Sequence, residues 1–299
     1  MHTTRLAFLG AVALAVAATA VACSDSPRAA GPVAPAAERA DVVTPRTPDA
    51  RANDDPATFR RIPAKYRWVG EEHNRLLNLA MQKAKAAHDD DPATYQRMKS
   101  DCGWVFVSMR DNMEPSAQRG GFASRRDEAI RAARQGIANL PQCRGSALPS
   151  LALFAAPLPS ASSAALGEYE DISDATLAAI SSMVGDIAEA GSPADIDAAI
   201  ARAAGVAASL PGNQGDAVYS AASLAAGSAA YWSYALPSSN LLALFARTSD
   251  WQRFRGAVAA DAGGCAGFLT AFGRWPLPWQ VKIAGCLLTG AAASAMTLF

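Results

Sequence analysis

Histidine and the motifs of common enzyme sites are scarce in this sequence. It has three histidines in 299 residues, and none follows His88. The zinc motifs His-Glu-x-x-His and Cys-x-x-Cys are absent, as are the Gly-x-Ser-x-Gly motif of serine hydrolases, the phosphate-binding P-loop and the dinucleotide fingerprint. We therefore expect no cofactor and no metal site, and we favour a non-enzymatic role.

Net charge and β-strand patterns are scarce as well. The formal net charge is zero, with 21 Lys/Arg and 16 Asp/Glu in residues 1–144 and 6 and 11 in residues 145–299. These dispersed charges of both signs argue against a nucleic-acid partner. Aromatic residues make up 7% of the chain, alternating β-branched runs are nearly absent, and Ala dominates the apolar residues. Because Ala favours helix and contributes little to a core, the composition predicts an all-α fold.

The first 22 residues carry the most specific signal in the chain. A short basic start precedes an uninterrupted apolar run, Leu6–Val21, which closes on the string Ala20-Val21-Ala22-Cys23. This pattern resembles a bacterial lipoprotein signal peptide that ends in a lipobox, although Ala20 stands where the motif usually has Leu. The resemblance implies that residues 1–22 are removed and that Cys23 is acylated, so that the N-terminal lipid holds the protein to a membrane.

A lipid anchor of this kind implies the cell envelope of a bacterium. Ser24 after the acylated cysteine, rather than Asp, favours the outer membrane by analogy with enteric bacteria. An ordinary secretory signal is the alternative, and it would leave the protein secreted or periplasmic.

If the protein is exported, its four cysteines other than Cys23 lie in an oxidising compartment. An even number of cysteines in an oxidising compartment indicates disulfides rather than buried thiols. Of the three possible pairings, clustering in the sequence favours Cys102–Cys143 and Cys265–Cys286. At a rise of about 1.5 Å per residue, Cys265 and Cys286 also lie at matching depth in a helical hairpin.

The segment after the predicted lipid site has almost no large apolar side chains. Residues 23–58 are rich in Pro, Ala, Thr and Asp. Such a segment cannot bury enough apolar surface to offset the entropy of ordering it. We expect a disordered tether.

Residues 59–144 carry three apolar stripes with helical spacing. The first predicts a helix over about Tyr66–His88, and the second predicts one helix that runs from Pro92 to Met113. A strand at Trp104–Met109 is the rival prediction, but the helical periodicity continues on both sides of it. The third helix follows a capping box at Ser124–Asp127.

The second half of the chain divides by composition. Residues 145–165 form a linker rich in Pro, Ala and Ser, and residues 166–256 form an Ala-rich helical region. Helices are expected to start near Ser173 and at Ser192-Pro193. Residues 257–299 have the pattern of a Gly/Ala-rich helical hairpin.

The predicted hairpin also has features of membrane-active segments. Small residues recur every fourth position in each arm, at Gly263, Gly267 and Ala271 and at Gly285, Thr289 and Ala293. Trp275 and Trp279 in the connector suit a membrane interface. The segment resembles glycine-zipper hairpins of bacterial envelope proteins, which implies close helix packing in a membrane. Its second arm is just short of a span and Asp261 would be costly in lipid, so a tightly packed soluble hairpin is the favoured alternative.

Two short strings suggest chemistry. Asp101-Cys102 superficially resembles the nucleophile segment of cell-wall-cleaving cysteine peptidases, but those enzymes need a His downstream and none follows here. The string Glu71-Glu72-His73-Asn74 invites a metal or acid/base site. Because His73 lies on an apolar stripe beside Asn74, we expect a hydrogen-bonded His at a packing seam and keep both residues as candidates for a polar site.

Taken whole, the chain is similar to uncharacterised bacterial lipoproteins that combine two features. These are an early Gly-x-x-His-Asn helix, here Gly70–Asn74, and a late Gly/Ala-rich hairpin, here residues 257–299. The resemblance implies no known activity. We expect an envelope lipoprotein with a binding or scaffolding role, and a protein partner is left open. A membrane-inserting or pore-like protein acting through residues 257–299 is the alternative, and an enzyme of unrecognised type is the third.

Overall fold

The computed structural model describes residues 47–55, 57–144, 146, 148, 171–238 and 250–297. These residues form eleven α-helices and two short 3₁₀ helices without a strand, so the predicted all-α fold is confirmed. The predicted signal peptide, Cys23, most of the tether and nearly all of the linker lie outside the described residues. The helices are α1 (Pro48–Asp54), α2 (Ala64–Asp90), α3 (Pro92–Met98), α4 (Gly103–Asp111), α5 (Glu114–Arg119), η1 (Ala123–Arg125), α6 (Arg126–Asn139), η2 (Pro141–Cys143), α7 (Asp174–Glu189), α8 (Pro193–Ala207), α9 (Asn213–Ser238), α10 (Asp250–Phe272) and α11 (Trp279–Thr297).

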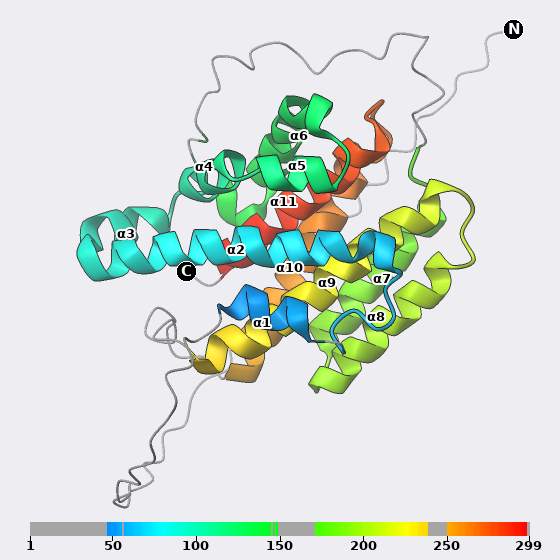
Figure 1. The fold of residues 1–299 in the computed structure, drawn as a ribbon, viewed down its shortest axis with the longest axis horizontal. Coiled ribbons are helices and arrows are strands. Elements are labelled where there is room, and N and C mark those ends of the chain that lie inside the picture. Colours follow the sequence, from blue (N-terminus) through cyan, green and yellow to red (C-terminus); the bar gives the residue numbers. More distant parts are fainter. Residues whose placement is uncertain are drawn as a thin grey trace, which may run out of the picture. The chain divides into compact units, whose positions relative to one another are not determined.

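The described helices form one compact unit, in which α2, α6, α9 and α10 pack on α11. The long helix α2 crosses α9 and α11, with α4, α5 and α6 on one side of it and α7 and α8 on the other (Figure 1). Every residue of α11 from Val281 to Met296 is buried. The regions expected at 59–144, 166–256 and 257–299 therefore share one core and are not separate bodies.

The predicted C-terminal hairpin is present as α10 and α11, and glycines set its close packing. A Cβ atom built on Gly264 of α10 would lie 3.0 Å from Cα of Gly290 in α11, closer than side chains normally approach. Cys265 and Cys286 are disulfide-bonded across the same seam, with their Cα atoms 4.0 Å apart. Small residues thus let the two backbones approach, as the sequence pattern indicates.

A second close crossing joins α2 to α9. A Cβ atom on Gly227 would lie 2.7 Å from the carbonyl oxygen of Gly70, and the Gly70 N–H donates to Ser223 Oγ at 3.1 Å. The glycine of the Gly-x-x-His-Asn string therefore allows the close contact between α2 and α9.

Three of the predicted helix starts have a side-chain cap. Asp91, Ser173 and Ser192 each accept a hydrogen bond from the backbone N–H three residues later, at 3.1, 3.2 and 3.3 Å. These caps satisfy N–H groups that the first turn of a helix leaves unpaired. The capping box predicted at Ser124–Asp127 is wrong, because the buried ring of Phe122 anchors a 3₁₀ turn there and α6 starts without a side-chain cap.

The single helix predicted from Pro92 to Met113 is also wrong, although the helical assignment of Trp104–Met109 is confirmed. The chain turns after α3, where Asp101 Oδ1 accepts from the Gly103 N–H at 2.8 Å and so starts α4. Pro115 lies in the first turn of α5, where a missing N–H is tolerated. Cys102, in the turn before α4, is bonded to Cys143 as predicted, with their Cα atoms 5.5 Å apart.

The predicted tether is wrong in its last part. Helix α1 packs on α2 and α9, and Ala52 of this helix is fully buried. Phe59, at the start of the next predicted region, is buried as well, and Thr58 Oγ1 donates to the Ala52 carbonyl at 2.9 Å. Contacts with the distant helices α2 and α9 thus accompany the order of this segment, which its own composition does not predict.

Candidate functional site

The strongest cluster of chemically capable side chains lies inside the protein, where α2 meets α10. His73 Nε2 lies 2.8 Å from Asp261 Oδ1, and both side chains are fully buried. The apolar stripe of α2 carries the imidazole inward, and Asp261 is the one acidic residue on the buried face of α10. The side chain of His73, a candidate for a polar site, is therefore hydrogen-bonded to an acidic residue inside the core.

The cluster extends to α9 and α1. Ser228 Oγ donates to Asp261 Oδ2 at 2.5 Å, so both oxygens of this carboxylate are bonded. On the other side, His73 Nδ1 lies 3.1 Å from Asn74 Oδ1, and Asn74 Nδ2 donates to Asn53 Oδ1 at 3.0 Å. Four helices thus meet in one hydrogen-bonded chain. The predicted partner of His73, Asn74, is present in it.

Burial and charge act on the imidazole in opposite directions. Burial lowers the pKa of His73, but the Asp261 carboxylate and the hydrogen bonds to Asp261 and Asn74 raise it more, so the net pKa lies above its ordinary value. Because both ring nitrogens have partners, the imidazole offers no open position to a substrate or a metal ion. The arrangement holds helices together.

Two polar atoms in the same part of the core have no hydrogen-bond partner among the described residues. They are the Tyr231 hydroxyl in α9 and Asp49 Oδ1 in α1. Burial raises the pKa of Tyr231, and the charges of Asp49 and Asp261 raise it further, so the hydroxyl keeps its proton. Among the described residues, no group of three or more His, Cys, Asp or Glu side chains is arranged to hold a metal ion.

A second buried charge lies one residue earlier in α2. Glu72 is 2% exposed and accepts hydrogen bonds from Arg75 at 2.7 Å, Ser116 at 2.8 Å and Arg119 at 2.8 Å. Burial raises the pKa of its carboxyl, but these three donors outweigh burial and hold the pKa below its usual range. Since adjacent helix residues point about 100° apart, Glu72 faces α5 while His73 faces α10.

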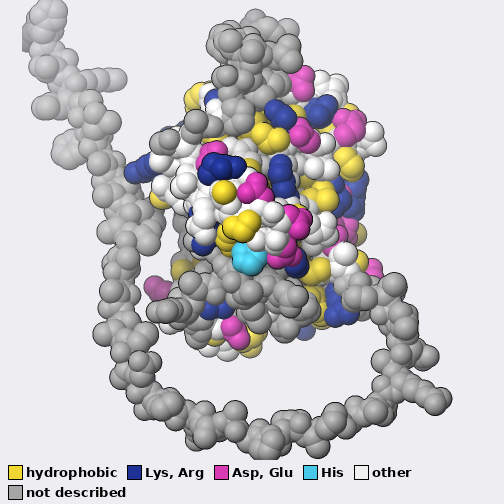
Figure 2. Space-filling model, turned by 90° about the vertical axis from the view of Figure 1, so that its left-hand side faces the viewer, with side chains coloured by type: hydrophobic (Ala, Val, Ile, Leu, Met, Phe, Trp, Pro, Cys, Tyr) yellow, Lys and Arg dark blue, Asp and Glu magenta, His cyan; other side chains and the backbone are white. Residues whose placement is uncertain are grey.

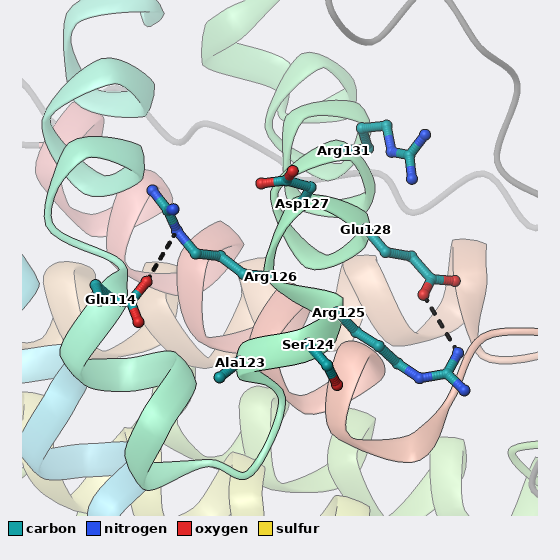
Figure 3. A pocket seen from close by; sticks show the side chains of 8 residues that line it. All are labelled: Glu114, Ala123, Ser124, Arg125, Arg126, Asp127, Glu128 and Arg131. Carbon is teal, nitrogen blue, oxygen red and sulfur yellow. Dashed lines mark hydrogen bonds and ion pairs between the residues drawn. The ribbon is translucent and has the colours of Figure 1, made fainter.

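The surface is hollowed at the start of α6. A basin of about 610 Å³ is lined by three arginines and three acidic residues, and four of these side chains form two ion pairs. Arg126 points toward Glu114 at 3.6 Å and Arg125 toward Glu128 at 3.5 Å (Figure 3). Mixed charge extends to other surfaces, since basic and acidic side chains alternate over the face at the α3 end (Figure 2). The basin therefore has no net charge with which to select an anion or a cation.

The two tryptophans predicted to contact a membrane differ in exposure. Trp275 is 40% exposed and Trp279 is 9% exposed. Among the described residues, no helix combines the length and hydropathy of a membrane span. The apolar character of α11 is accounted for by its position in the core.

Sequence reasoning found His73, Asn74 and the four bonded cysteines, but it missed the residues that complete the cluster. Asp261 was visible as a lone acid in an apolar helix, and His73 as a lone imidazole on an apolar stripe. Two such residues signal a buried pair, because a buried charge needs a partner. Ser228 and Tyr231 carry no comparable signal in an Ala/Ser-rich helix.

Comparison with known proteins adds no relative to these observations. No protein-family model, curated protein or solved structure matches the chain.

Proposed function

We propose that this protein is an envelope lipoprotein with a non-enzymatic binding or scaffolding role, held to the membrane by a lipid on Cys23. The observation that carries the proposal is the use made of the buried charged groups. His73, Asp261 and Glu72 have their polar atoms engaged by other side chains, and each joins two helices. Groups in closed pairs of this kind fix a shape rather than transform a substrate.

The packing of the C-terminal hairpin supports a scaffold over a membrane-inserting protein. Helix α11 contacts α2, α6, α9 and α10, and the polar residues Thr289 and Ser294 are buried with it. Insertion of the hairpin in a membrane would expose the faces of α2, α6, α7 and α9 that pack on α10 or α11, and would separate Asp261 from His73. Both consequences carry a large free-energy penalty.

The lipid anchor is tested by fractionation of the expressed protein and of its Cys23→Ala variant. We expect the unmodified sequence in the membrane fraction, resistant to alkaline carbonate, and the variant in the soluble fraction without detergent. An intact mass that shows an unmodified N-terminus at another residue would contradict lipidation, and would leave secretion or the periplasm as the location.

The membrane-inserting alternative is favoured by one observation, the exposed ring of Trp275 at the tip of the hairpin. Liposomes added to the Cys23→Ala protein distinguish the two roles. We expect no change in tryptophan fluorescence, because the hairpin stays packed. A blue shift that is lost in a Cys23→Ala, Trp275→Phe double variant would favour insertion, since the other tryptophans are unchanged in that control.

A further inference from the structure

A small recess lies between α6 and α10, with α11 as its floor. Its volume is about 150 Å³, and its lining is mainly apolar. Phe268 and Phe272 supply aromatic walls from α10, and Gly267 of the same helix leaves the opening wide. Gly136 lets α6 lie close against Phe268 and Thr289. A Cβ atom on Gly267 would meet nothing within 4 Å, so the recess is open on that side.

The floor of the recess carries a hydroxyl that has no partner. Thr289 is 1% exposed, and its Oγ1 makes no hydrogen bond to any of the described residues. A Cβ atom on Gly136 would lie 2.5 Å from this Oγ1, so the hydroxyl points across the floor toward α6. Burial of an unpaired hydroxyl is unfavourable, and a partner inside the recess removes the penalty.

We propose that this recess binds a small molecule that consists of one ring, or a branched aliphatic body of similar size, with a single hydrogen-bonding group. The volume matches that of protein cavities that hold one benzene ring. The apolar walls take the body of the ligand, and its polar group pairs with Thr289. This site goes beyond the proposed anchoring and scaffolding role, and its test needs neither the lipid nor a membrane.

Phenol is the probe, and toluene is the matched molecule that lacks the hydroxyl. Binding is measured by titration calorimetry or ligand-observed NMR on the Cys23→Ala protein without its first 22 residues. We expect phenol to bind with a Kd of about 1 mM, which is ordinary for a ligand this small. We expect Thr289→Val to weaken phenol about fivefold and to leave toluene within about twofold, because it removes one hydrogen bond and keeps the shape.

Blocking the recess gives the second arm of the test. Gly267→Leu fills the open side, and we expect it to weaken both ligands at least about tenfold. Gly256→Leu is the matched control, because Gly256 lies in the same helix, outside the recess, and its Cβ position is equally free. Circular dichroism and melting confirm that both variants fold. We expect both to do so, because Leu is a better helix former than Gly.

Four results would overturn the assignment. Phenol that shows no binding at about 10 mM, or binds Gly267→Leu as well as the parent, does not use this recess. Equal losses of phenol and toluene in Thr289→Val would show that the hydroxyl has no role. A dimer in sedimentation that Gly267→Leu dissociates and Gly256→Leu does not would mean that a second copy covers the recess instead.

Discussion

Replacing Asp261 by Asn tests whether the buried pair with His73 holds α2 against α10. Both side chains are fully buried at a separation of 2.8 Å, and Asn keeps the shape of the side chain while removing its charge. Removing one partner of a buried ion pair typically costs about 3–5 kcal/mol, because the other charge stays buried without compensation. We expect the free energy of unfolding to fall by about that amount near pH 6.

The pH dependence of this loss is the sharper test. The pKa of His73 is raised in the folded protein, so its pairing contributes stability that is fully present below the unfolded pKa of about 6.5. That stability is lost as the pH rises through the folded pKa, by about 1.4 kcal/mol per pH unit between the two values. Without Asp261, only the Asn74 bond opposes burial, and we expect the pKa of His73 to drop below 6.5. The variant therefore loses stability as the pH falls below 6.5.

The parent protein and the Asp261→Asn variant should therefore differ less in free energy of unfolding as the pH rises. Urea unfolding, followed by circular dichroism from about pH 5.5 to about pH 9, measures this difference in free energy. The contributions of groups that titrate alike in both proteins cancel in the difference. Asp186→Asn is the matched control, since Asp186 lies at the same 2.8 Å from Arg202 but on the surface, where such a pair contributes about 0–1 kcal/mol. A difference that stays constant with pH, or a similar loss in the control, would refute the role of the buried pair.

Two further predictions concern the close crossings. Gly70→Ala should lower the free energy of unfolding by about 1–3 kcal/mol, because the new methyl group meets the α9 backbone. Gly205→Ala is the control: its Cβ position faces open space, and the change should raise the free energy of unfolding by up to about 1 kcal/mol. Denaturant titrations check both, and a loss of equal size at the two sites would contradict the crossing. Replacing Cys265 and Cys286 together by Ala should cost about 3 kcal/mol, as the bond closes a separation of 21 residues. If the reduced parent and the double variant melt as the oxidised parent does, the bond is not stabilising.

Local signals in the sequence predicted what is local in the fold. Helix starts at Asp91, Ser173 and Ser192 follow from side chains that bond a backbone N–H three residues away, so nothing distant is needed to find them. The predictions that failed depend on distant groups. Helix α1 is ordered by contacts with α2 and α9, and the 3₁₀ turn before α6 is set by burial of Phe122.

The disulfide pairing lies between these cases. Each bond joins two consecutive cysteines of the four, so clustering along the chain alone selected the right one of three pairings. The surroundings of the hairpin, in contrast, could not be predicted from the sequence. An apolar helix rich in small residues has the same composition whether lipid or protein surrounds it, and only the helices packed on α11 show which surroundings it has here.

Two patches, Gly70–Asn74 and the C-terminal hairpin, are far apart in the chain but meet in the fold. Gly70 lets α9 approach α2, and the next turn then presents His73 to Asp261 of the hairpin. A buried Asp is stable only beside such a partner, and the partner reaches it only where the helices pack closely. Each patch therefore depends on the other for its stability. This mutual dependence accounts for both patches of this chain by packing, without a ligand. Residues that bind something else are then to be sought where packing leaves an atom unpaired, as it does at Thr289.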